Sequence, residues 1–142
     1  MSSRMLSNKR AGYALQEVLN LFGELSDKQK KEFKKFVAGA PAMIQQNGFG
    51  QALAFWLAKD EGKNNTKYRK LFNMVVRWLS YKKQDIHNRF IYTERPQENY
   101  QQVMLELSGM KQDGFLAAQK ESMAVLEWIK RFAHAYAPKE DS

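Results

Sequence analysis

Residues 40–58 read APAMIQQNGFGQALAFWLA, and this stretch decides between a helical and a β-sheet fold. Its Asn47-Gly48 pair is a strong hairpin signal when alternating strands flank it. Here neither flank alternates, because PAMIQQN is about two helical turns long and FGQALAFWLA resumes a helical apolar pattern. A glycine such as Gly48 suits the left-handed position that follows a helix end. We therefore predict a corner between two helices at Asn47-Gly48.

Apolar residues at three- and four-residue spacing predict a long helix near the start of the chain. Within residues 4–24 they are Ala11, Ala14, Leu15, Val18, Leu21 and Phe22. Ser26 and Gln29 then form the pattern of an N-cap with a capping box, which begins a second helix. We predict that this helix ends near Gly39 and that Pro41 occupies the first turn of the next one.

Three more helices are predicted after the corner. The first has Asn65 as a possible N-cap and covers TKYRKLFNMVVRWLSY, with its apolar residues on one face. Pro96 begins the next, PQENYQQVMLELSG, and the last covers residues 112–137. No segment alternates with period two for long enough to predict a strand. The sequence therefore predicts an all-α fold, a single-domain bundle of about six helices over residues 1–142.

Composition points to a soluble protein. The chain has 142 residues and no cysteine, which excludes disulfides and thiolate metal sites and fits a reducing compartment. The N-terminus lacks the apolar run of a signal peptide, and no segment approaches the roughly 18 apolar residues of a membrane span. We expect a cytoplasmic protein with no membrane partner.

Positive charge is in excess and unevenly distributed. The chain has 23 Lys or Arg and 15 Asp or Glu, a net charge of +8. Residues 59–95 hold ten basic and four acidic residues, a net of +6, whereas residues 96–142 hold five and seven, a net of −2. Such asymmetry is typical of a surface that binds phosphate groups, although a general preference for lysine would also produce it.

One predicted helix face concentrates this charge. Lys67, Lys70 and Arg77 lie about one to two turns apart on the side opposite the apolar residues. Cations at this spacing could follow a phosphate backbone and release its counterions. Three nearby aromatic residues could stack on unpaired bases, namely Tyr81, Phe90 and Tyr92. Charged side chains also occupy the solvated face of most helices, so the pattern by itself leaves both interpretations open.

The residues that carry most enzyme chemistry form no recognisable site in the sequence. His87 and His134 lie far apart, and neither has metal-ligand spacing. The adjacent carboxylates Asp60 and Glu61 are predicted to lie in a solvated turn rather than in a metal site. No phosphate-loop, dinucleotide-binding or nucleophile-elbow motif is present. We predict no enzymatic activity, no cofactor, no metal and no small-molecule substrate.

Three blocks of the sequence resemble the small subunit of the type III-B (Cmr) CRISPR effector complex. The first block is PAMIQQNGFGQALAF, which matches through Pro41, Met43, Ile44, Asn47, Gly48, Gln51, Leu53 and Phe55. The second is YRKLF followed by WL, within residues 68–79. The third is ESMAVLEWIKRFAHAY, which matches through Glu121, Leu126, Trp128, Lys130, Arg131, Phe132 and Ala133. The blocks span most of the chain in the right order, while residues 82–99 match nothing in the family.

This resemblance implies a small all-α subunit without catalytic activity of its own, acting in antiviral defence. Copies would stack along the inner filament of the effector, beside the repeated backbone subunit that holds the guide RNA. Basic faces would line the groove where guide and target RNA pair. The implied partners are other Cmr subunits, further copies of the chain, guide RNA and target RNA. The RNA-binding candidates are Lys67, Lys70, Arg77, Lys130 and Arg131.

Two roles are open for the corner. A structural role is favoured, because glycine chiefly serves backbone geometry. In the alternative, Asn47, Gly48 and Gln51 face a neighbouring subunit or RNA.

Two other functions are also open. A stand-alone basic helical nucleic-acid-binding module, for instance a helix–turn–helix around residues 41–58, would bind duplex DNA without partners. Against it, QALAFWLA is too apolar to supply base-reading side chains. A metal-independent ribonuclease centred on His87 would cleave RNA in the presence of a chelator and would lose activity as His87→Ala.

Overall fold

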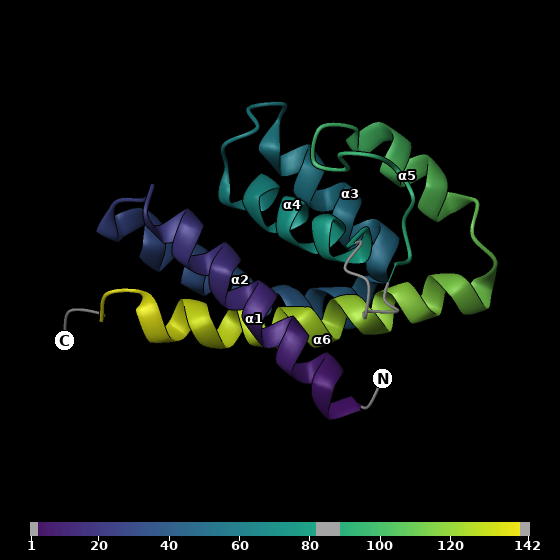
Figure 1. Cartoon of the computed structure of the whole chain (residues 1–142). Coiled ribbons are helices and arrows are strands. Elements are labelled where there is room, and N and C mark those ends of the chain that lie inside the picture. The colour runs from purple at the N-terminus through teal and green to yellow at the C-terminus, as the bar shows by residue number, and fades with distance from the viewer. Residues whose placement is uncertain (1–2, 82–88, 140–142) are drawn as a thin grey trace.

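Six α-helices make up the part of the chain that the computed structural model describes, residues 3–81 and 89–139, and no strand occurs there (Figure 1). In chain order they are α1 (Ser3–Phe22), α2 (Asp27–Asn47), α3 (Phe49–Asp60), α4 (Lys67–Leu79), α5 (Tyr100–Ser108) and α6 (Gln112–Tyr136). The predicted all-α fold is therefore confirmed. None of these helices combines the length and the apolar character needed to cross a membrane.

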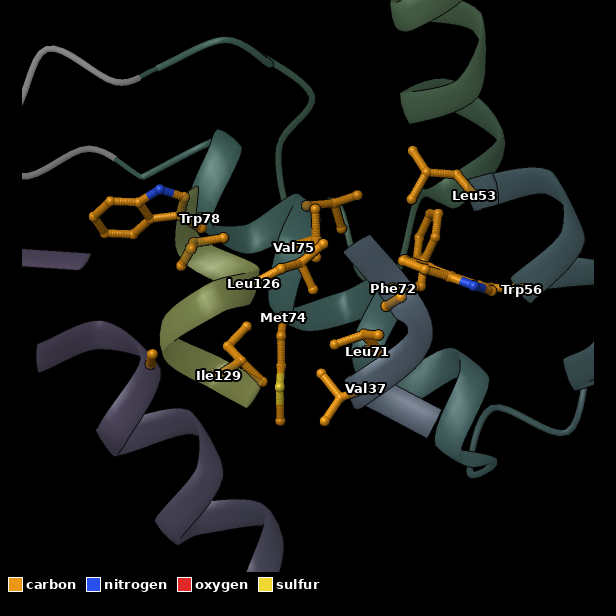
Figure 2. Close-up of a cluster of buried hydrophobic side chains, with 14 of the residues drawn as sticks. Val37, Leu53, Trp56, Leu71, Phe72, Met74, Val75, Trp78, Leu126 and Ile129 are labelled. Atoms are coloured by element: carbon orange, nitrogen blue, oxygen red, sulfur yellow. The ribbon is translucent and has the colours of Figure 1, made fainter. Parts of the chain in front are cut away.

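Helix α4 lies at the centre of the core. Figure 2 shows its buried side chains, which include Leu71, Phe72, Met74, Val75 and Trp78. Around them lie side chains from three other helices, namely Val37, Leu53, Trp56, Leu126 and Ile129. All of these residues are at most 2% exposed. Since each large apolar side chain buried in this way contributes about 1.5–3 kcal/mol, α4 is the helix on which the fold most depends.

The remaining helices surround α4 in pairs. The long helices α1 and α6 cross and pack against each other, and α2 also packs against α6 (Figure 1). Helix α3 packs against α4, and the short α5 contacts α3. Two pairs of neighbouring helices, α1 with α4 and α2 with α6, therefore bring polar side chains from distant parts of the sequence onto shared surfaces.

The second helix is longer than predicted. Its capping box is confirmed, because the Ser26 side chain accepts a hydrogen bond from the Gln29 N–H and the Gln29 side chain accepts one from the Ser26 N–H. The predicted end near Gly39 is wrong, however, since α2 continues through Pro41 to Asn47. Proline removes one helical hydrogen bond. Here the ring is buried with Ala40 and Ile44, and this apolar burial offsets the loss.

Two other predicted helix starts are also wrong. The N-cap of α4 is Thr66 rather than Asn65, because the Thr66 side chain accepts a hydrogen bond from the Arg69 N–H. Helix α5 begins at Tyr100, not at Pro96, and Pro96 instead lies in a turn. This turn follows a left-handed backbone at Arg95, with φ of 47°.

Candidate nucleic-acid interface

The three cations predicted on α4 lie next to α1, which supplies carboxylates. The Arg77 guanidinium donates a hydrogen bond to Glu17, and the Lys70 ammonium lies 4.0 Å from a carboxylate oxygen of Glu24. Burial opposes the charged form of Arg77, but the Glu17 carboxylate outweighs it and holds the pKa of Arg77 above its usual value. The α1 carboxylates therefore neutralise part of the positive charge of this face.

The two cations predicted on α6 lie on a different surface. Lys130 and Arg131 line an open groove of about 340 Å³ together with Lys34, Lys35, Ala38 and His134. We call this surface the α2/α6 groove. No carboxylate of the described residues lines it. Arg131 is exposed, and its guanidinium lies 5.3 Å from the centroid of the Trp128 ring. The fold thus brings cations from two helices, far apart in sequence, to one positively charged surface.

The predicted base-stacking aromatic residues differ in accessibility. Tyr81 is half-buried, with its ring centroid 5.1 Å from that of Trp78 and 5.6 Å from that of Tyr13. Phe90 also packs against the core. Tyr92 is 63% exposed and lies under the Arg89 guanidinium, 4.5 Å from its ring centroid. Of the three, Tyr92 therefore offers the most open ring face for a base.

The two histidines have different outcomes. His134 is exposed, as predicted, and contributes to the α2/α6 groove. His87, on which the ribonuclease alternative depends, lies outside the described residues. Residues 3–81 and 89–139 contain no group of three or more His, Asp or Glu side chains that could hold a metal ion.

The corner between α2 and α3 is confirmed at Asn47-Gly48. Gly48 has φ of 87°, donates its N–H to the Ile44 carbonyl at 2.8 Å and accepts the Ala52 N–H at 3.1 Å. The Asn47 side-chain amide donates to the Met43 carbonyl at 3.3 Å. Gln51 is exposed on the first turns of α3. One glycine thus ends one helix and begins the next, which only a residue that tolerates positive φ can do without strain.

The prediction of a solvated turn is wrong for Asp60, which is fully buried, and holds for the exposed Glu61. The Asp60 carboxylate accepts hydrogen bonds from the Asn64 N–H and from the N–H and hydroxyl of Thr66. Burial opposes its ionisation, but these hydrogen bonds and the nearby Arg69 hold the pKa of Asp60 below its usual value. Asp60 therefore shapes the loop before α4.

Arg69 extends this arrangement to the segment before α5. Its guanidinium lies 3.5 Å from Asp60, donates to the Asn64 side chain at 2.6 Å and to the Gln97 carbonyl at 3.1 Å. The ring centroid of Tyr100 lies 4.4 Å from the same group. Since all these partners belong to the protein, the arrangement is structural. The spacing of Asp60, Asn64 and Thr66 was the signal that could have predicted a side-chain-capped turn.

Glu121 was matched to a family block but given no role. Its carboxylate is 7% exposed and accepts two hydrogen bonds from the Arg10 guanidinium, at 2.6 and 2.8 Å. A third hydrogen bond comes from the Trp78 indole N–H at 2.8 Å. The hydrogen bonds from Arg10 to Glu121 raise the pKa of Arg10 further, against the effect of burial. One carboxylate therefore connects α1, α4 and α6.

Residues 6–136 match the sequence model of a protein family described as CRISPR-associated protein (Cas_Cmr5). The match begins within α1 and ends at the last residue of α6. It contains the corner, the α2/α6 groove and the three blocks on which the resemblance rested.

Proposed function

Because this chain belongs to the Cmr5 family of CRISPR-associated proteins, and is thus a subunit of a Cmr complex, we propose that it is a non-catalytic subunit that contacts RNA. In this proposal, copies stack along the inner filament beside the backbone subunit. Their basic surfaces line the groove where guide and target RNA pair. The RNA contact is sequence-independent, because it relies on phosphate groups.

The α2/α6 groove supports the RNA part of this proposal best. Lys130 and Arg131 share it with Lys34 and Lys35, and no carboxylate of the described residues lines it. Lys67, Lys70 and Arg77 form the second candidate surface. We rank it lower, because Glu24 and Glu17 lie beside two of its three cations. A phosphate backbone gains more from cations that are not already paired with carboxylates.

Charge reversal tests which surface contacts RNA. In a reconstituted Cmr complex, we expect Lys130→Glu with Arg131→Glu to weaken target-RNA binding by about tenfold or more and to reduce the salt dependence by about two phosphate contacts. A matched variant, Lys59→Glu with Lys63→Glu, changes two exposed cations outside the groove and should leave both quantities unchanged. Unchanged RNA affinity in the groove variant would remove the groove from the proposal.

Purification from the native host tests the assembly. A tagged chain purified at moderate salt should bring down other Cmr subunits and guide RNAs. Recovery of the chain alone, or with unrelated DNA, would instead favour the stand-alone nucleic-acid-binding module.

We place a subunit contact at the corner. Asn47 and Gln51 are exposed, and Gly48 between them is half-buried. The outer side of α3 continues from Gln51 with the exposed residues Ala54, Phe55 and Ala58, and Phe55 is 42% exposed. A helix that is apolar on all sides is normally buried, so this side of α3 fits a protein partner better than water.

A further inference from the structure

A second cavity lies on the other side of α2, where the end of α1 and the start of α4 meet that helix. Its volume is about 350 Å³, which falls within the range of roughly 300–1,000 Å³ typical of small-ligand sites. Its apolar part comes from Leu21 and Phe33, which are buried, and from Leu25, which is half-buried. This part can take an apolar or aromatic body of a ligand.

Polar groups gather around the same cavity. Lys67 and Lys70, from the first turn of α4, provide two ammonium groups. The Lys70 pair with Glu24 does not block it, because Glu24 is 71% exposed and the separation of 4.0 Å is typical of a weak surface pair. Two cations beside an apolar pocket suit a ligand that carries both an anionic group and an apolar group.

Three further side chains line the cavity with hydrogen-bonding groups. Asn65 is exposed, and Gln29 uses its side-chain oxygen to accept the Ser26 N–H, which leaves its amide NH₂ as a donor. Glu32 adds one carboxylate, a group that accepts hydrogen bonds from sugar hydroxyls. Amide groups can donate to and accept from the edge of a base.

We propose that this cavity binds one nucleoside monophosphate unit. Its base lies on Leu21, Leu25 and Phe33, its phosphate lies between Lys67 and Lys70, and its ribose hydroxyls donate to Glu32. The unit is a ligand and not a substrate. It comes either from a free nucleotide or from one unpaired nucleotide of an RNA strand. Only the RNA source rests on the function proposed above.

The test is an NMR titration of the full chain with AMP, and with adenosine and inorganic phosphate as separate probes. AMP should shift the amide signals of Leu25, Gln29 and residues 65–68 and bind at least about tenfold more tightly than either part alone. Lys67→Glu with Lys70→Glu should weaken AMP by about tenfold or more. The matched variant Lys59→Glu with Lys63→Glu lies outside the cavity and should bind AMP like the parent protein.

Absence of shifts at the cavity with a Kd of about 1 mM or below would overturn the proposal, as would equal effects of the two variants. The spectra also report whether each variant is folded. Competition by an RNA with one unpaired nucleotide, and not by a fully paired RNA, would assign the ligand to RNA. Competition by neither would assign it to a free nucleotide. A failure of the α2/α6 groove in RNA binding would leave the AMP result unchanged, so the two proposals fail separately.

Discussion

At the scale of single residues, the carboxylate of Glu121 accepts three hydrogen bonds from side chains of two other helices. Glu121→Gln removes the negative charge from a group that is 7% exposed and leaves the Arg10 guanidinium without its counterion. We expect the free energy of unfolding to fall by about 2–3 kcal/mol. Urea denaturation measures this change.

Arg10→Met is the matched variant for the same pair. The double variant should be less destabilised than the sum of the two single variants, because both remove one interaction. A loss below about 0.5 kcal/mol in Glu121→Gln would contradict the account, since it would be typical of a surface substitution.

Asp60 gives a prediction for pH. Its hydrogen bonds hold the pKa of the folded carboxyl below its usual value, so the unfolded state binds a proton more readily than the folded state. The stability that Asp60 contributes is therefore fully present at neutral pH and is lost as pH falls through about 4 and below. Asp60→Asn should destabilise the protein by about 2 kcal/mol or more at pH 7.

Denaturant unfolding at several pH values checks this expectation. The gap in stability between the parent protein and Asp60→Asn should narrow as pH falls below about 4. A gap that stays constant from pH 7 to pH 3 would mean that the Asp60 charge does not stabilise the loop.

The roles of these residues could not be predicted from the sequence. Apolar spacing placed Trp78 on a buried face, and this was correct. The partner of its indole lies 43 positions away, and the arginine that shares this partner lies 111 positions from it. Periodicity reports which side of a helix is buried, but it says nothing of which distant polar group lies opposite.

At the scale of elements, the corner depends on one backbone conformation. Gly48 has φ of 87° and ψ of 156°, a region that residues with a side chain rarely adopt. A side chain at this position would meet nothing within 4 Å, so strain and not crowding sets its cost. We expect Gly48→Val to cost about 1–3 kcal/mol and to lower the melting temperature by roughly 5–10 °C.

Gly39→Ala is the matched control, since Gly39 lies inside α2 with open space around it and no positive φ. It should stabilise the protein by about 0.5–1 kcal/mol. If Gly48→Val kept full stability but prevented assembly of the complex, the structural role of the corner would be wrong and the interface role would replace it.

Helices were easier to predict than their ends. The capping box at Ser26 and the glycine at the corner are local signals, and both were correct. Pro41 gave a misleading signal, because the sequence alone does not show that burial of its ring offsets a missing hydrogen bond. Pro96 misled in the same way, since the left-handed turn at Arg95 separates it from α5.

At the scale of the whole molecule, the fold decides which charges are available to RNA. The sequence correctly indicated an excess of cations, but the largest local excess, in residues 59–95, includes Arg77 and Lys70, which lie beside α1 carboxylates. The α2/α6 groove could not be predicted, because its cations are divided between two helices that are almost 100 residues apart. The candidate surface therefore came half from the sequence, through Lys130 and Arg131, and half from packing.

The most direct test of the central claim is RNA–protein crosslinking in the assembled Cmr complex with target RNA bound, followed by mass spectrometry of the crosslinked peptides. We predict crosslinks in α2 and α6, on peptides that contain Lys34, Lys35, Lys130 or Arg131. Crosslinks confined to α1 and α4, or an absence of any crosslink to this subunit in a complex that holds target RNA, would contradict the claim that the α2/α6 groove contacts RNA.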